Sequence, residues 1–418
     1  MEIQLPYGKD TVPCTVDEKH LLQIIKTKDS IPPDKPERMI QQSLNRPYGT
    51  EPLSELAQHG DRVAIVVDDY TRPSPTKLLL PPVLNELKKA GVVDTDVTII
   101  IATGTHTPPS FETIKSIVGD KISRNYTTIS NDNKNSDYVS VGNSQYGNTI
   151  EILQDYVDAD IKILVGDIEY HYFAGYGGTR KSVLPGIASA ETIQNNHAMM
   201  FHQDANTGIL SSNPVSREMT EAMYMADCDF ALSCVLNAQH QIVGVWAGDA
   251  SSIMNAGVKL VDEMYKKQIP KRPDILITAA DGHPHDINLY QALKALYTAS
   301  QVISEQGVII LVAACPEGMG NDRYINWMKN YETSEEIKQA LQKHFKIGAH
   351  KAFYHRDISE KNTVILVSEM NDSFVKDKLG FIPAKDPNEA LMKAKEITGE
   401  NAILVVPQGT TTHLVTEE

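Results

Sequence analysis

Two short polar segments carry side chains suited to chemistry, and each follows an apolar run of the chain. Residues 68–75 place Asp69 and Arg72 before two prolines. A guanidinium binds a carboxylate through two parallel hydrogen bonds, and a nearby carboxylate can orient the arginine or a ligand hydroxyl. Residues 102–109 contain His106, whose imidazole titrates near neutral pH and suits acid–base catalysis. Taken alone, each segment is also compatible with an ordinary polar loop.

The third segment, residues 166–186, is the richest in reactive groups. Its glycines allow a tight loop whose backbone amides can point at a phosphate, as in Gly175, Gly177 and Gly178. The pair Lys181-Ser182 resembles the end of a P-loop, but Arg180 stands where that motif needs glycine, which excludes a P-loop ATPase. Lys181 is therefore either a charge partner or a covalent attachment point, because a deprotonated lysine amine acylates or forms Schiff bases.

Two more histidines are candidates in this part of the chain. His171, within the same segment, is a second acid–base candidate. His197 falls on a helix predicted from about residue 190 to residue 200, and imidazole is a common ligand for nickel and similar metals. A single histidine without a spaced partner is a weak metal signal, so a structural role is the simpler interpretation unless a cofactor supplies further ligands.

A fourth candidate lies in the second half of the chain. Residues 281–294 run from a Gly/Pro turn into a helix on which Gln291 and Lys294, three residues apart, share one face with Tyr290 nearby. This face can hold a ligand carboxylate or hydroxyl, or it can simply face solvent. The histidines of the turn, His283 and His285, fit a polar loop better than a metal site.

The elements that must position these groups follow an α/β pattern. Strands are predicted at 62–67, 97–102, 161–166, 230–236, 275–278, 308–313, 363–367 and 402–406, with helices between them at 76–90 and 288–300, among others. Fully apolar strands separated by helices indicate parallel sheets covered on both faces. Ser334 is predicted to cap one helix and Asp386, before Pro387, another.

We predict two α/β domains with largely parallel sheets and an active-site cleft between them. Residues 1–268 form the N-terminal domain and residues 269–418 the C-terminal domain, whose extreme end is expected to pack back on the first. The charged, proline-interrupted stretch 266–273 is the best linker candidate. A cleft of this kind places ligands at the carboxyl ends of parallel strands.

Composition narrows the class of partner. The chain of 418 residues has a formal net charge of −15, which argues against nucleic acid and anionic membranes as main partners. No run of residues approaches the length of a membrane span, no secretory signal is visible, and the four cysteines match no common metal or redox pattern. We therefore expect a cytoplasmic protein with reduced thiols.

Together these segments resemble the nickel-dependent lactate racemase family, in order and in spacing, over nearly the whole chain. The matching pieces are Asp69-x-Thr71-Arg72-Pro73-x-Pro75, Gly104-x-His106, His171-x-Phe173-Ala174-Gly175, the run from Arg180 to Ser189, Asn196-His197 and Tyr290-Gln291-Ala292-x-Lys294. The chain departs from the family in the glycine loop, where the family more often has a serine and two glycines before the basic pair. A histidine, His350, also stands near a position where the family's lactate enzyme has tryptophan.

The resemblance implies a cofactor, the nickel-pincer nucleotide (nickel(II) pyridinium-3,5-bisthiocarboxylic acid mononucleotide), bound covalently to Lys181 and contacted by Asp69, Thr71, Arg72, Gly177 and Gly178. It implies that His197 completes the nickel coordination, with the cofactor supplying the other donors. Separate biosynthetic proteins are expected to load the group.

The resemblance also implies the reaction. A hydride leaves and returns to the α-carbon of a 2-hydroxy acid while His106 and His171 exchange the hydroxyl proton on opposite faces. Arg72, Tyr290, Gln291 and Lys294 are the implied substrate-binding residues. Lactate is the leading substrate, and malate-like or sugar acids are the alternatives.

Two other classes stay open from the sequence alone. An NAD-dependent dehydrogenase also uses arginine and histidine, but no G-x-G-x-x-G follows a predicted strand. A non-catalytic protein that carries the cofactor is the second alternative, and the retained histidine pair argues against it.

Overall fold

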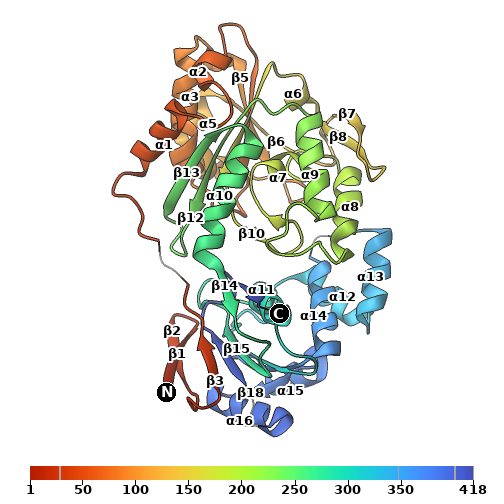
Figure 1. Ribbon diagram of the computed structural model, residues 1–418. Helices are drawn as coiled ribbons and strands as arrows, with labels where there is room; N and C mark the ends of the chain where they lie inside the picture. The colour runs from red at the N-terminus through yellow and green to blue at the C-terminus, as the bar shows by residue number, and fades with distance from the viewer. Residues whose placement is uncertain (28–29, 347, 400–401, 418) are drawn as a thin grey trace. The chain divides into compact units, whose positions relative to one another are not determined.

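The chain folds into two compact α/β units (Figure 1). The computed structural model describes all residues except 28–29, 347, 400–401 and 418. The central unit is Asp29–Met264, and the terminal unit joins Met1–Lys28 to Tyr265–Glu418. The prediction of two α/β domains with largely parallel sheets is confirmed. The predicted cleft between them stays a prediction.

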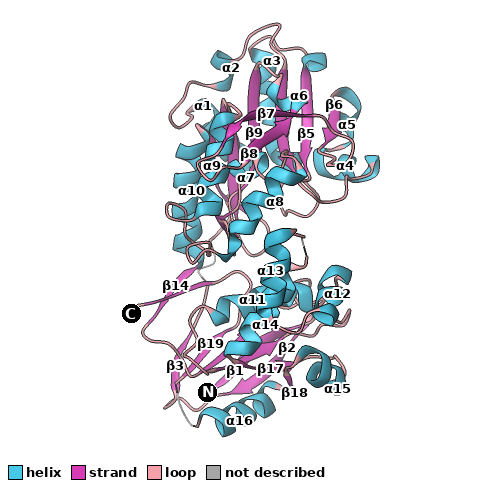
Figure 2. Ribbon diagram, turned by 90° about the vertical axis from the view of Figure 1, so that its right-hand side faces the viewer, coloured by secondary structure: helices cyan, strands magenta, loops and turns pink. Residues whose placement is uncertain are grey.

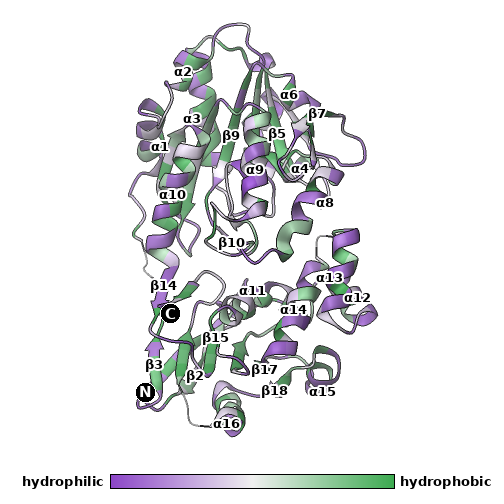
Figure 3. Cartoon of the chain, turned by 45° about the vertical axis from the view of Figure 1, so that its right-hand side comes forward, coloured by the Kyte–Doolittle hydropathy of each residue, from purple (hydrophilic) through white to green (hydrophobic). Residues whose placement is uncertain are grey.

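The sheet of the central unit positions most of the candidate residues. Its strand order is β13-β12-β9-β4-β5-β6, parallel throughout except for the β12–β13 pair. The strands are β4 (Val63–Asp68), β5 (Val97–Ala102), β6 (Thr127–Ser130), β9 (Ile161–Asp167), β12 (Phe230–Leu236) and β13 (Ile242–Gly248). The middle strands are apolar and buried, which Figure 3 shows in green, because helices cover the sheet on either side.

Helices and two small hairpins complete the central unit (Figure 2). The helices are α1 (Pro36–Asn45), α2 (Leu53–Leu56), α3 (Thr76–Lys89), α4 (Phe111–Val118), α5 (Asp120–Asn125), α6 (Gln154–Val157), α7 (Arg180–Val183), α8 (Ala190–Ala198), α9 (Pro214–Met225) and α10 (Ala250–Tyr265), with 3-10 turns at Asp94–Asp96 and Met199–Phe201. The hairpins pair β7 (Tyr138–Asn143) with β8 (Thr149–Leu153), and β10 (Tyr170–His171) with β11 (Gly175–Tyr176).

The terminal unit has its own parallel sheet, in the order β18-β17-β16-β15-β19-β3. Its strands are β3 (Leu21–Ile24), β15 (Ile275–Ala279), β16 (Val308–Val312), β17 (Thr363–Val367), β18 (Ile382–Ala384) and β19 (Ile403–Val406). Its helices are α11 (Leu289–Ser300), α12 (Asp322–Asn330), α13 (Ser334–Lys343), α14 (His350–Lys361), α15 (Asp372–Phe374) and α16 (Pro387–Thr398), with a π-turn at Val375–Leu379. A hairpin pairs β1 (Glu2–Tyr7) with β2 (Asp10–Thr15).

Three local predictions differ from the structure. The first 28 residues, predicted in the N-terminal domain, belong to the terminal unit because β3 pairs with β19. The linker candidate at 266–273 begins as strand β14 (Lys266–Ile269), which pairs with β20 (His413–Thr416) near the C-terminus. Thr333, not Ser334, caps α13, in a reciprocal capping box with Glu336, whereas Asp386 caps α16 as predicted.

Candidate active site

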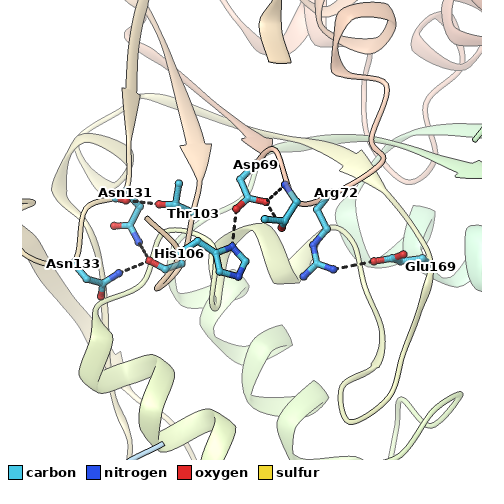
Figure 4. A network of polar contacts seen from close by, with 9 residues as sticks. Asp69, Arg72, Thr103, His106, Asn131, Asn133 and Glu169 are labelled. Carbon is cyan, nitrogen blue, oxygen red and sulfur yellow. Dashed lines mark hydrogen bonds and ion pairs between the residues drawn. The ribbon is translucent and has the colours of Figure 1, made fainter. Parts of the chain in front are cut away.

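The carboxyl ends of β4, β5 and β9 bring the first three candidate segments together. The strands lie side by side in parallel register, with Asp68 opposite Ala102 and Val67 opposite Val165. Parallel strands end at the same edge of a sheet, so the residues that follow them meet there. Asp69, His106 and Glu169 therefore lie close together although they are far apart in sequence (Figure 4).

His106 is held by Asp69. Its Nδ1 lies 2.7 Å from Asp69 Oδ2. The other carboxylate oxygen accepts hydrogen bonds from the backbone N–H (3.1 Å) and the hydroxyl (2.6 Å) of Thr71. Burial alone would raise the pKa of Asp69, but the hydrogen bonds from His106 and Thr71 outweigh it and lower the pKa. An ionised carboxylate only accepts, so Nδ1 carries the proton and Nε2 of the neutral ring is a free base.

The loop that carries His106 is fixed by asparagines from the next segment along the sheet. The carbonyl of Gly104 accepts hydrogen bonds from the side-chain amides of Asn131 (3.2 Å) and Asn133. The hydroxyl of Thr103 donates to the backbone carbonyl of Asn131. The backbone N–H of Gly104 donates to Gly186 (2.9 Å), at the end of the Lys181 loop. These contacts join the His106 and Lys181 segments.

Arg72 has a different partner from the one that the sequence indicates. Its Nη1 lies 3.2 Å from Glu169 Oε1, so the guanidinium is balanced by an acid two residues past β9. Beneath this pair Asp68 and Asp167 lie close together, and the N–H of Asp167 reaches Asp68 at 3.3 Å. Burial raises the pKa of Asp68 to about 6, although the charge of Arg72 opposes the rise. Sequence analysis missed Asp68, Asp167 and Glu169, whose only signal is their place at strand ends.

Lys181 lies on the short helix α7, just after the glycine loop. Burial and the charge of Arg72 lower its pKa well below the usual lysine value, against the opposing charges of Glu169 and Asp68. At neutral pH this favours the uncharged, nucleophilic amine. Gly178 has a φ of 95°, and a Cβ there would lie 2.5 Å from the carbonyl oxygen of Asp167, so the loop requires glycine.

His197 is buried on α8 in a neutral form. Its Nδ1 lies 3.1 Å from Asn196 Oδ1, and its ring packs edge-on to Phe173 at 5.1 Å. Burial, with the charges of Lys181 and His106, lowers its pKa to about 3. Metals bind the neutral imidazole, so this environment suits a ligand. The same electrostatic coupling shows that His197, Lys181 and His106 are neighbours.

His171 lies at the end of β10 with its ring between aromatic neighbours. It stacks on Tyr172 at 4.7 Å and meets Phe173 edge-on at 4.6 Å. Its Nδ1 accepts a hydrogen bond from the backbone N–H of Ala174 (3.2 Å). With Nδ1 accepting, the proton of the neutral ring sits on Nε2. His171 is therefore arranged as a donor, whereas His106 is arranged as an acceptor.

The candidates of the second half lie in the terminal unit, at the start of α11. Asn288 caps the helix by accepting from the N–H of Gln291, so Tyr290 and Gln291 fall in its first turn and Lys294 one turn later. Asp281, just after β15, lies near enough to Lys294 for that charge to lower its pKa, although burial dominates and raises it to about 6.

Within the described residues, no three His, Cys, Asp or Glu side chains gather in a way that could hold a metal ion by themselves. His197 would therefore need donors from another molecule. No helix in the described part of the chain is long and apolar enough to cross a membrane.

Comparison with known proteins covers both units. The lactate racemase N-terminal domain matches residues 7–208, and the lactate racemase C-terminal domain matches residues 268–414. The lactate racemase of Thermoanaerobacterium thermosaccharolyticum is 32% identical, with 97% of each chain covered, and that of Lactiplantibacillus plantarum is 31% identical, with 97% of this chain and 98% of the relative covered.

Solved structures agree. The lactate racemase apoprotein from Thermoanaerobacterium thermosaccharolyticum superposes with a TM-score of 0.89 at 32% identity, covering 100% of both chains. A Thermotoga maritima protein of 18% identity has a TM-score of 0.64, covers 91% of this chain and 98% of its own, and shows the shared fold alone.

Proposed function

The chain belongs to the lactate racemase family, and on that premise we propose that it inverts the stereocentre of a small 2-hydroxy acid with a nickel-pincer nucleotide held on Lys181. It is an isomerase, and lactate, which the relatives' names give, is the first substrate to test. The observation that carries the proposal is the grouping of Lys181, His197 and His106, whose charges act on one another.

The residues present are suited to such a cofactor. Lys181 offers an amine of lowered pKa for covalent attachment, and His197 offers a neutral imidazole for nickel. Gly177 and Gly178 leave room for close approach to the loop, since a Cβ at Gly178 would meet backbone. Thr71 and Asp69 lie on the other side of the same strand edge. When bound, this group supplies reversible acceptance of the substrate's α-hydrogen as hydride.

The two histidines would handle the hydroxyl proton. Nε2 of His106 takes the proton from the substrate hydroxyl, and Asp69 stabilises the resulting imidazolium through Nδ1–H. The planar 2-oxo acid turns, hydride returns to its other face, and Nε2–H of His171 delivers a proton to the oxygen. One histidine arranged as acceptor and one as donor is the pair that such an inversion needs.

The substrate carboxylate would be held by cations. Arg72 is already placed by Glu169, and Lys294 lies with Gln291 on α11, so we assign these groups to the carboxylate and the substrate's polar atoms, with Tyr290 shaping the site. Cofactor-biosynthesis proteins are the partners expected for loading, and a cytoplasmic location stays a prediction.

The test is chiral analysis of D-lactate incubated with the protein, co-produced with the cofactor machinery and nickel and without NAD. We expect L-lactate to appear, and to be lost in His106→Ala and His171→Ala. Asp155→Asn, an exposed change on α6, is the control. Protein that carries the cofactor by intact mass but exchanges no α-hydrogen on any 2-hydroxy acid would support a carrier instead, and NADH formation a dehydrogenase.

A further inference from the structure

The strongest unassigned feature is a buried lysine, Lys351, beside the substrate-binding helix. Lys351 is the second residue of α14 and is 5% exposed. Its Nζ lies 5.8 Å from the centre of the Tyr290 ring, and Tyr290 is the second residue of α11. An ammonium at this position is costly twice over, because burial opposes its charge and a helix N-terminus repels cations.

Lys351 also lies near a second cation. The charge of Lys294 adds to burial in lowering the pKa of Lys351 to about 7. Burial raises the pKa of Tyr290, and the charge of Arg323 opposes that rise, which places a third positive charge near the same ring. Like charges gathered at two helix N-termini are stabilised by an anion that lies among them.

One acid offsets part of this charge. Asp281 interacts with Lys294, but its carboxylate is already used by Thr410, which donates its backbone N–H at 3.2 Å and its hydroxyl, and by the hydroxyl of Thr411 at 3.2 Å. Of the groups named here, three are cations and one is an anion. The balance therefore suits a ligand with two negative charges better than a ligand with one.

We propose that Lys351 holds a second carboxylate of the substrate, so that the enzyme acts on 2-hydroxy dicarboxylates in preference to lactate. The inference rests on the proposed function, in which Lys294 and Arg72 hold the carboxylate next to the reacting carbon. Lys351, on the neighbouring helix, then faces the far end of the substrate, where lactate has only a methyl group. A methyl group against a buried ammonium gains nothing, whereas a carboxylate gains a charge-assisted hydrogen bond.

The test compares malate with lactate on cofactor-loaded protein, with loading verified by intact mass. We expect kcat/KM for malate to exceed that for lactate by about 10-fold or more. In Lys351→Met the ratio of malate to lactate kcat/KM should fall by about 10- to 100-fold. Lys361→Met, an exposed lysine on the same helix paired with Asp357, should leave the ratio unchanged.

Each contrary result has its own meaning. Racemisation of lactate with no preference for malate overturns the inference and leaves the proposed function standing. Loss of the cofactor mass in Lys351→Met would assign Lys351 to the nucleotide phosphate and also overturn it. Failure of loaded protein on every 2-hydroxy acid removes the proposed function and the inference together. If Lys351→Met does not fold, the wild-type preference and Lys351→Gln decide the matter.

Discussion

His106 in the central unit and His355 in the terminal unit show how one residue type serves two purposes. His106 is held at one ring nitrogen, by Asp69, and its side chain is 30% exposed. His355 is fully buried with both nitrogens in use, Nδ1 with the Tyr324 hydroxyl at 2.5 Å and Nε2 with the carbonyl of Leu379 at 2.7 Å. Its ring also stacks on Phe381 at 4.4 Å.

The difference lies in what is left over. A histidine with both nitrogens satisfied inside the protein has no atom for a substrate and contributes stability. A histidine with one nitrogen fixed has a defined tautomer and a free nitrogen for proton transfer. Burial, which looks like importance, distinguishes the structural residue here rather than the catalytic one.

Asp69→Asn should break the His106 side of this comparison with the largest effect. An asparagine at this place can donate to Nδ1 and favours the wrong tautomer, and it cannot stabilise the imidazolium. We expect kcat/KM to fall by about 10²- to 10⁴-fold while the melting temperature changes little. Steady-state racemisation and calorimetry measure both. A loss of stability in proportion to the loss of activity would make Asp69 structural.

Acid titration of stability should sharpen the His355 side. Burial lowers the pKa of His355 to about 4, against an unfolded value of about 6.5. Between these values the unfolded chain binds more protons, so this stabilisation is complete above about pH 6.5 and is lost as pH falls through the window. Denaturant unfolding should show that wild type loses about 2 kcal/mol more than His355→Gln between pH 7.5 and pH 5. Parallel pH curves for the two proteins would contradict the assignment.

Asn133→Ala should give the smallest effect. Asn133 and Asn131 both donate to the carbonyl of Gly104, so the His106 loop keeps one of two amide donors when Asn133 is lost. We expect about 1 kcal/mol of lost stability and a change in kcat/KM of less than about 10-fold. A drop as large as that of Asp69→Asn would mean that the loop, not the acid, sets the position of His106.

Much of the fold follows from local pattern. The strands β5, β12 and β17 have the bounds predicted for them, because each is a continuous apolar run between polar turns. The place of the first 28 residues did not follow, because the pairing of β3 with β19 joins segments at opposite ends of the chain. No local signal encodes such a partner.

The site shows the same limit. Residue types and positions after strands were enough to nominate His106 and Arg72. Their partners were not predictable in detail, since Asp69 lies 37 residues from His106, and Glu169 lies 97 residues from Arg72. Those distances close only once the order of strands in the sheet is known. Lys351 was not nominated at all, because nothing in its sequence neighbourhood indicates that its side chain is buried.

The most direct measurement is the intact mass of the wild-type chain and of Lys181→Ala, each co-produced with the cofactor machinery and nickel, with D-lactate and D-malate racemisation assayed on the same samples. The account predicts a covalent mass increase and inversion of a 2-hydroxy acid in wild type, and neither in Lys181→Ala. Arg217→Ala, on α9 and paired with Gln145, is the control and should behave as wild type. Racemisation by Lys181→Ala, or a wild-type chain that inverts these acids with no added mass, would contradict the central claim.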